Sequence, residues 1–283
     1  MVEKRELRYL CSVIVKQYTQ TDIQKTICRC LPSRKAVIRN SQYINPIIYI
    51  KVMLEIRNIT FGYDKKVVLN DFSMKLENGG VYGLLGKNGT GKSTLLYLIM
   101  GLLRPKSGEV LFNGQNTFGR NPDVLKHMFI VPEEYDLPNT TLSAYIKRIR
   151  PFYPNFDEQI LKDCLEVFEM PADVNMKSLS MGQKKKIYIS LALAIRAELL
   201  VMDEPTNGLD IPAKSQFRKA IARGMSENQT ILISTHQVRD VELLLDHVTI
   251  INQHGVLLNE PINTEEPTDL EKLFLDTLAT AGE

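Results

Sequence analysis

Short apolar runs alternate with longer stretches of helical period over the second half of the chain. The runs lie at residues 199–202, 230–233 and 248–251, and polar residues bound each of them. Runs that are apolar throughout are typical of strands buried on both faces. Their alternation with helices predicts an α/β domain in which helices cover both faces of a parallel sheet.

An earlier region of the chain has a different pattern. Residues 53–60 alternate between apolar and polar positions, and β-like runs at 67–69, 72–76 and 109–112 follow, with turn residues between them. Strict alternation is typical of strands with one buried face. We therefore predict a small β-rich region around the start of the parallel sheet.

Residues 137–186 are more polar and have the period of amphipathic helices. Asn155 is suited to cap one helix, because Glu158 follows three residues later and completes a capping pattern. An apolar stripe recurs at helical spacing up to Pro171, and its members are Phe156, Ile160, Leu161, Leu165 and Phe168. We expect this stripe to be core and the segment to be a helical subdomain.

Charge separates the N-terminal residues from the rest. Residues 1–52 contain ten Lys and Arg against three Asp and Glu; the whole chain is +2, so residues 53–283 carry −5. A mildly acidic main domain argues against a nucleic-acid surface. We expect a basic extension or a start site chosen too early, since Met53 begins the first clear strand; a transit peptide is the alternative. The main domain is predicted at 53–262 and a tail at 263–283.

The composition argues against a membrane-spanning segment and against a zinc site. No apolar run approaches the roughly 20 residues that a membrane-spanning helix needs. Cys28 and Cys30 lie close together but lack a second pair, which disfavours a zinc site. Reduced thiols in a cytoplasmic protein are the simpler expectation.

One glycine-rich stretch predicts phosphate binding. It fits the spacing G-x-x-x-x-G-K-[ST], follows the apolar residues 81–85 and precedes a helical pattern. Its glycines let several backbone N–H groups face one anion, and the helix N-terminus adds partial positive charge. The Lys can reach the terminal phosphates, and the hydroxyl after it is placed for Mg²⁺. The candidate residues are Gly86, Lys87, Asn88, Gly89, Thr90, Gly91, Lys92, Ser93 and Thr94.

Two carboxylates form a second candidate site. The apolar run 199–202 leads directly into Asp203 and Glu204. In open α/β sheets, ligands bind at the carboxyl edge of the strands, which is where these side chains should lie. Asp203 is placed to hold Mg²⁺, and Glu204 could accept a proton from an attacking water.

Further motifs give a specific family resemblance. Leu179–Gln183 is similar to the signature motif of the ATP-binding cassette (ABC) family, with methionine in place of the first of two glycines. Gly208–Asp210 resembles the family's D-loop, His236 its switch histidine, and Tyr63 the aromatic residue that stacks on adenine. These motifs follow the family's order across most of the main domain.

The resemblance implies a P-loop NTPase core with a parallel sheet, an N-terminal antiparallel β subdomain and an inserted α-helical subdomain. It also implies that two cassettes pair head to tail, with each ATP between the phosphate loop of one and the signature motif of the other. Ser180, Gly182 and Gln183 would then contact a nucleotide that the partner cassette holds. Asp210 would help to shape the dimer contact.

In such a dimer, catalysis would consist of positioning and charge neutralisation. Lys92 would hold the terminal phosphates, Glu204 would polarise the water, and His236 would hold the γ-phosphate. The chain departs from the family after the strand at 128–131, where Glu133 takes the place of the usual Gln. This carboxylate either faces solvent or points inward, as an oxygen ligand that suits Mg²⁺.

Some polar residues match no motif. Lys184–Lys186 are expected to be a solvated face at a helix start. His127, His247 and His254 are expected to be structural.

The resemblance implies the ATP-hydrolysing subunit of an ABC transporter, with a separate membrane permease as partner. It would be cytoplasmic and peripheral on the inner face of the cell membrane, and of exporter type, because the helical segment is short and no long C-terminal regulatory domain follows. The alternative is a soluble ABC ATPase that acts on the ribosome or DNA. Glu204 disfavours a third class, a regulator without hydrolysis. The sequence names neither the cargo nor the partner cassette.

Overall fold

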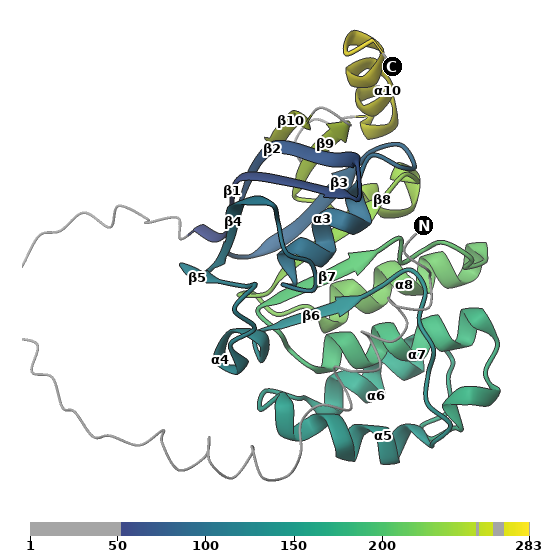
Figure 1. Ribbon diagram of the computed structural model, residues 1–283. Helices are drawn as coiled ribbons and strands as arrows, with labels where there is room; N and C mark the ends of the chain where they lie inside the picture. Colours follow the sequence, from purple (N-terminus) through teal and green to yellow (C-terminus); the bar gives the residue numbers. More distant parts are fainter. Residues whose placement is uncertain (1–51, 253–254, 263–268, 283) are drawn as a thin grey trace, which may run out of the picture. The chain divides into compact units, whose positions relative to one another are not determined.

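The chain divides into two units, Met1–Lys51 and Val52–Glu283. The computed structural model describes residues 52–252, 255–262 and 269–282 (Figure 1). The expectations for the N-terminal extension, the Cys28–Cys30 pair and His254 fall outside the described residues, except that Val52 begins the first strand.

A six-stranded sheet forms the centre of the second unit, in the order β10-β9-β3-β8-β7-β6. Its strands are β3 (Gly80–Leu85), β6 (Met128–Val131), β7 (Leu199–Asp203), β8 (Thr230–Thr235), β9 (His247–Asn252) and β10 (Gly255–Pro261). All neighbouring pairs are parallel except β9 and β10. The predicted parallel sheet is therefore confirmed, and β10 adds an antiparallel edge strand that the apolar pattern does not indicate.

A second, antiparallel sheet has the order β2-β1-β4-β5. Its strands are β1 (Val52–Tyr63), β2 (Lys66–Glu77), β4 (Ser107–Phe112) and β5 (Gln115–Asn116). The predicted runs 67–69 and 72–76 belong to one strand, β2. Asp71, which lies between the two runs, has a positive φ of 52° and accepts a hydrogen bond from the Asn58 side chain. Short polar side chains tolerate this left-handed conformation, so the strand bends and continues.

The helix α3 (Lys92–Ile99) packs between the two sheets. Successive side chains of β7 point to opposite faces of the sheet, and both faces are covered, so residues 199–202 are all apolar. Leu199 and Val201 belong to the cluster that contains α3 and the antiparallel sheet, whereas Leu200 and Met202 face the helices on the other side. Each fully buried side chain of this kind contributes about 1.5–3 kcal/mol to folding.

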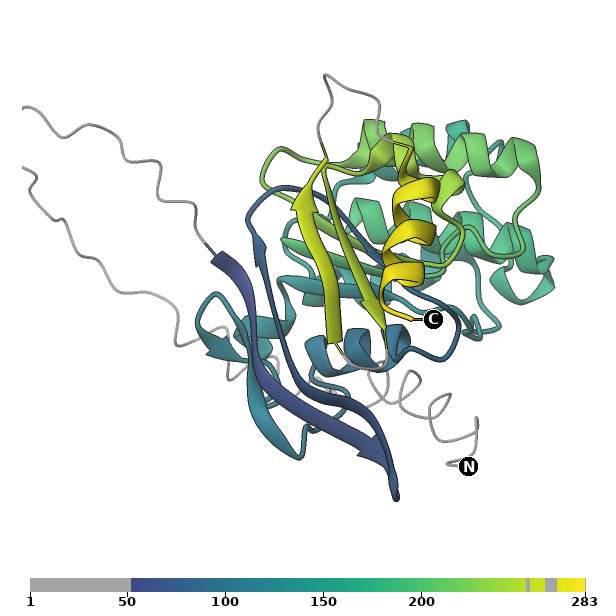
Figure 2. The same ribbon diagram turned by 90° about the horizontal axis from the view of Figure 1, so that it is seen from above.

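The opposite face of the large sheet is covered by α7 (Met181–Ala194), α8 (Ile211–Gly224) and the short α9 (Val238–Val241). A further helix, α10 (Leu270–Thr280), lies within the segment predicted as a tail. Figure 2 shows it alongside β9 and β10. Its apolar residues Leu270, Phe274 and Leu278 are buried in the same cluster.

The helical subdomain is built from α5 (Leu142–Ile149) and α6 (Glu158–Val167), which pack with α7. The remaining short helices are α4 (Pro122–Leu125), η1 (Arg150–Phe152), η2 (Met176–Ser178) and η3 (Glu242–Leu244). The prediction that Asn155 caps α6 is wrong. Asp157 is the cap, because its carboxylate accepts hydrogen bonds from the N–H groups of Gln159 and Ile160 and its charge suits the helix N-terminus.

None of the helices within the described ranges is long and apolar enough to cross a lipid bilayer.

Candidate functional site

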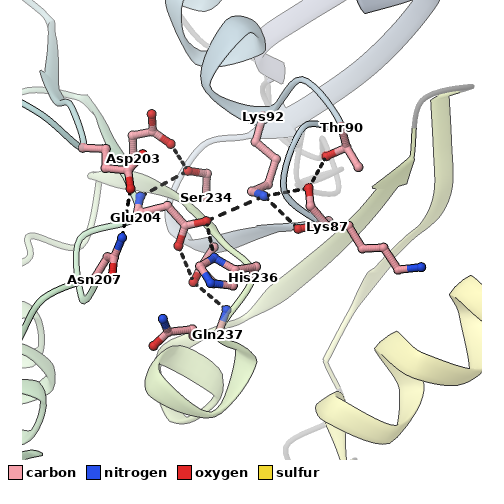
Figure 3. A network of polar contacts seen from close by, with 12 residues as sticks. Lys87, Thr90, Lys92, Asp203, Glu204, Asn207, Ser234, His236 and Gln237 are labelled. Atoms are coloured by element: carbon pink, nitrogen blue, oxygen red, sulfur yellow. Dashed lines mark hydrogen bonds and ion pairs between the residues drawn. The ribbon is translucent and has the colours of Figure 1, made fainter.

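The topology brings three separate segments to one edge of the large sheet. β8 lies between β3 and β7, and the pairs Leu85–Thr235 and Asp203–Ser234 mark the carboxyl ends of these parallel strands. The phosphate loop follows β3, the two candidate carboxylates end β7, and His236 follows β8. Figure 3 shows that Lys92, Asp203, Glu204 and His236 converge there.

The backbone of the phosphate loop requires glycine at two positions. A Cβ on Gly86 would lie 2.8 Å from Thr90 Oγ1 and 2.9 Å from the Ile251 carbonyl oxygen. Gly91, the N-cap of α3, has a φ of 101° and a Cβ there would lie 2.9 Å from Val68 Cγ1. The loop is closed by Thr90, whose hydroxyl donates to the Lys87 carbonyl at 3.0 Å. The helix α3 thus begins directly at the loop, as an anion site requires.

The Lys92 ammonium lies inside this loop and is only 6% exposed. It donates hydrogen bonds to the carbonyls of Gly86 at 2.7 Å and Lys87 at 3.2 Å, and Glu204 Oε1 is 3.6 Å away. Burial lowers the pKa of Lys92, and the negative charges of Glu204 and Asp203 act in the opposite direction. The site therefore concentrates a cation and two carboxylates where water has little access, which strengthens their electrostatic effect on a bound phosphate.

Asp203 is buried and has one unused acceptor. The Ser234 hydroxyl donates to its Oδ1, whereas its Oδ2 is buried without a hydrogen-bond partner among the described residues. Burial raises the pKa of Asp203, and the hydroxyls of Ser234 and Ser93 oppose this rise. A buried carboxylate oxygen of this kind, close to the Ser93 hydroxyl, fits an oxygen-seeking divalent cation.

The Glu204 carboxylate is held by the last residue of β8 and by the residue that follows it. Its Oε1 lies 2.8 Å from His236 Nδ1, and its Oε2 accepts a hydrogen bond from Thr235 Oγ1 at 3.0 Å. The backbone of Glu204 is in the left-handed region, with a φ of 44°, and its N–H donates to the Ser234 carbonyl. Non-glycine residues in this conformation are uncommon and concentrate at functional sites.

Tyr63 lies beside the helix that follows the phosphate loop. It ends β1, its ring packs edge-on against Phe61 with centroids 5.0 Å apart, and its hydroxyl is 3.5 Å from Thr94 Oγ1. The aromatic ring is therefore within reach of the same loop, where a base could stack on it.

The signature segment is not part of this cluster. Ser180 is the N-cap of α7 and forms a reciprocal capping box with Gln183. Met181 is 70% exposed, and a Cβ on Gly182 would meet nothing within 4 Å. Within the part of the chain that the structure describes, no hydrogen bond or ion pair joins this segment to the phosphate loop. Asp210 is likewise exposed and caps α8 through the Ala213 N–H.

Comparisons with known proteins agree with this geometry. A family described as "ABC transporter" matches residues 69–207. The lantibiotic transport ATP-binding protein SrtF of Streptococcus pyogenes is 34% identical over 225 residues, which cover 78% of this chain and 96% of SrtF. The zinc uptake system ATP-binding protein ZurA of Listeria innocua is 31% identical over 215 residues, 71% of this chain and 83% of ZurA.

The chain belongs to the ABC transporter family. A solved structure titled "Structure of ATP binding subunit of ABC transporter" superposes with a TM-score of 0.70 at 24% identity, covering 80% of this chain and 99% of that one. This likeness supports the fold. The predicted ABC ATPase architecture and ATPase activity are thus confirmed. The individual site residues stay predictions, which the geometry above makes specific.

Glu133, at the place of the family's usual Gln, is half-buried in this ABC protein. Its Oε1 accepts a hydrogen bond of 2.9 Å from Asn207 Nδ2. Its negative charge nevertheless contributes to raising the pKa of Asp203 and opposes the lowering of the Lys92 pKa. Glu133 therefore lies at the margin of the site, and its part in binding Mg²⁺ stays a prediction.

The expectation that Lys184–Lys186 form a solvated face is wrong for Lys185, which is only 7% exposed. Lys185 precedes the buried residues Ile189 and Ala192 by four and seven positions, so it lies on the face of α7 that packs inward. This spacing is visible in the sequence and could have indicated its burial. Lys186 is half-buried and donates to Gln216 Oε1 at 2.8 Å.

Proposed function

We propose that this ABC ATPase binds ATP with Mg²⁺ at the phosphate loop and hydrolyses it in a head-to-tail pair with a second cassette. The pair would drive a separate membrane-spanning permease. The observation that carries this proposal is the cluster of buried Lys92 and Glu204 with half-buried His236 at one sheet edge, together with an exposed signature segment that shares no hydrogen bond or ion pair with it among the described residues.

Each side chain of the cluster has a distinct part in the proposed reaction. Asp203 and Ser93 would hold Mg²⁺, which neutralises phosphate charge when bound. Lys92 adds a second positive charge beside the terminal phosphates. Glu204, whose oxygens lie between Lys92 and His236, accepts a proton from the attacking water. His236 contacts the γ-phosphate and is kept in place by Glu204 Oε1.

The surface features support a second cassette. Ser180 presents a helix N-terminus, which favours a phosphate group from another molecule. Ile211 follows the Asp210 cap directly and is 84% exposed, as Met181 is at 70%. In a head-to-tail pair, the partner cassette would cover these two exposed apolar side chains. Ser180, Gly182 and Gln183 would then complete the site of the partner cassette.

We infer a peripheral position on the inner face of the cell membrane, since the permease would supply the membrane-spanning part. The two relatives named above serve lantibiotic transport and zinc uptake, so they do not determine cargo or direction. We propose export, because the helical subdomain before α7 contains only α5 and α6 as helices longer than one turn among the described residues. A soluble ATPase that acts on the ribosome or DNA is the alternative.

The substitution Glu204→Gln tests the reaction. It keeps the shape of the side chain but removes the proton acceptor, so ATP binding should persist while turnover falls by at least about 100-fold. An ATP-bound dimer should accumulate, measured by size-exclusion chromatography with and without ATP. The matched control is Glu166→Gln on the exposed side of α6, which should behave like the wild type. Near-normal hydrolysis by Glu204→Gln would contradict the part given to Glu204.

Co-purification tests the partner. The full-length chain, carrying Glu204→Gln to stabilise the ATP-bound pair, is isolated from membranes and from the soluble fraction of the same cells. Recovery of a multi-spanning protein with the membrane fraction is expected. Recovery with ribosomes or DNA instead would support the alternative. Transport into or out of vesicles that contain the same complex, rebuilt with the wild-type chain, would then decide direction.

A further inference from the structure

Lys185 is a buried lysine of α7 whose ammonium is bonded to the backbone. Its Nζ donates hydrogen bonds to two backbone carbonyls, those of Glu204 at 3.1 Å and Asn207 at 2.8 Å. Within the described residues its ammonium forms no ion pair with a carboxylate. Burying a charge without a direct counter-charge is unfavourable, so this position carries a cost that an apolar side chain would avoid.

Longer-range charges reduce this cost. Burial lowers the pKa of Lys185, and the negative charges of Glu133, Glu204 and Asp203 act in the opposite direction. These are the acidic side chains that surround the candidate site. The ammonium therefore lies within the electrostatic field of the site while its hydrogen bonds go only to the backbone.

The two carbonyls belong to one turn. The Asn207 N–H donates to the Glu204 carbonyl at 3.2 Å, which closes the turn from Glu204 to Asn207. The Lys185 ammonium donates to the carbonyls of the first and last residues of this turn. The first residue of this turn is Glu204, whose φ of 44° is unfavourable for its residue type. A conformation of this kind persists only where surrounding contacts impose it.

We propose that Lys185 is a positioning residue for hydrolysis. It holds the turn after β7 in the form that directs the Glu204 carboxylate toward His236, Thr235 and Lys92. This inference rests on the proposed role of Glu204. Lys185 touches neither nucleotide nor water in the proposed reaction and acts through the backbone of Glu204.

Lys185 also connects the start of α7 to the backbone of Glu204. It lies five residues after Ser180 on α7, a rise of about 7.5 Å along the helix axis. The helix that presents the signature segment to the second cassette is thus tied, within two turns, to the backbone of the proposed base. A shift at the start of α7 therefore reaches Glu204 through a single side chain.

The test compares two neighbouring lysines in the full-length chain. Lys185→Met keeps an unbranched side chain of nearly the same length and removes both hydrogen bonds. Lys186→Met is the matched control, because Lys186 also donates to a backbone carbonyl, that of Phe168 at 3.3 Å, but contacts α6 and α8 rather than the turn. The probes are MgATP turnover and the Kd for a fluorescent ATP analogue, with Tm measured for each variant.

The groups that hold the nucleotide are intact in Lys185→Met, whereas the base is misplaced. We expect kcat to fall by at least about tenfold while Kd stays within about threefold of the wild type. Lys186→Met should keep both values within about threefold, even where its Tm is lower. Lys185→Arg retains a cation with several donors and should raise kcat at least about threefold above Lys185→Met. If Lys185→Met does not fold, Lys185→Leu, which also removes both hydrogen bonds, replaces it with the same expected separation of kcat from Kd.

A double variant separates this inference from the role of Glu204. If Lys185 acts through Glu204, adding Lys185→Met to Glu204→Gln should lower the single-turnover rate by less than about threefold. A further tenfold loss in that background, a normal kcat in Lys185→Met, or equal losses in Lys185→Met and Lys186→Met would overturn the proposal. Normal turnover in Glu204→Gln alone would instead overturn the role of the base, whatever the lysine variants show.

Discussion

The two halves of the proposed ATP site differ in how the chain builds them. On the phosphate-loop side, the side chains of Lys92, Asp203 and Glu204 are each less than a tenth exposed and are held by groups at the carboxyl ends of β3 and β8. On the signature side, the hydrogen bonds of Ser180 to described residues stay within its own helix start, and Met181 beside it is 70% exposed. One half is assembled within the chain, whereas the other presents its polar groups outward.

This difference has a physical basis. Charged groups act strongly on a phosphate when their orientation is fixed before the ligand binds and when water is excluded, which is the situation on the phosphate-loop side. An exposed capped helix end provides a weaker and screened attraction until a second surface covers it. The comparison therefore predicts that removing the buried cation of the phosphate-loop side impairs nucleotide binding by the single chain, whereas substitutions on the signature side impair only turnover.

The largest effect is expected from Lys92→Ala. Removing the ammonium from the phosphate loop should weaken ATP affinity at least about tenfold, or about 1.4 kcal/mol, as measured by equilibrium titration of the isolated chain. Lys126→Ala, which removes an exposed lysine paired with Asp123, is the control and should leave affinity unchanged. A change of less than about threefold in Lys92→Ala, or about 0.7 kcal/mol, would contradict the assignment of the loop.

The phosphate-loop half could be predicted almost completely from the sequence, and for a physical reason. A motif such as Gly86–Thr94 specifies its own backbone, because glycine spacing and the following helix leave few alternatives. Likewise, an apolar strand that ends in Asp203 and Glu204 fixes where those carboxylates emerge. The ABC fold follows from the same local patterns, since buried parallel strands are apolar throughout.

What the sequence does not indicate depends on contacts between distant segments. The left-handed backbone of Glu204, the hydrogen bond from Asn207 to Glu133 and the antiparallel strand β10 all depend on tertiary neighbours. Lys185 is an intermediate case. Its helical phase with Ile189 indicates burial, but three consecutive lysines suggest a solvated surface, and only the fold decides between these signals.

On the signature side, a substitution should affect turnover and leave ATP binding by the single chain unchanged. Ser180→Ala removes the cap of α7 and the polar group that would face the partner cassette, so turnover should fall about tenfold while ATP affinity of the isolated chain stays unchanged. The cap loss should also reduce the free energy of unfolding by about 0.5–2 kcal/mol. Thr141→Ala, which removes the hydroxyl cap of α5, is the control: it should lose similar stability but keep turnover. Equal losses of turnover in both variants would show that stability alone is responsible.

A smaller effect is expected at Glu133, which lies between the two halves. Glu133→Gln should reach normal activity at saturating Mg²⁺ but require a few-fold more Mg²⁺ for half-maximal rate, and Glu133→Ala should shift further, since an oxygen ligand is lost. Asn207→Ala removes the hydrogen bond that Glu133 accepts and separates the two explanations. If Glu133 serves only as the partner of Asn207, the Mg²⁺ titrations of all three variants will match that of the wild type.

The smallest effect is expected from deleting residues 1–51. This deletion tests whether the phosphate-loop side of the site needs any residue before Val52. The clusters that support Lys92, Asp203 and Glu204 are made by residues within the second unit, which begins with β1 at Val52. Because Val52 pairs with Glu77, the deletion should end before it rather than after it. The truncated chain should therefore keep the Tm, the ATP affinity and the turnover of the full-length protein. A lower Tm with unchanged affinity would show that the first unit stabilises the second. A loss of ATP affinity would show that residues 1–51 contribute to the phosphate-loop side. The second unit would then not assemble that side of the site by itself.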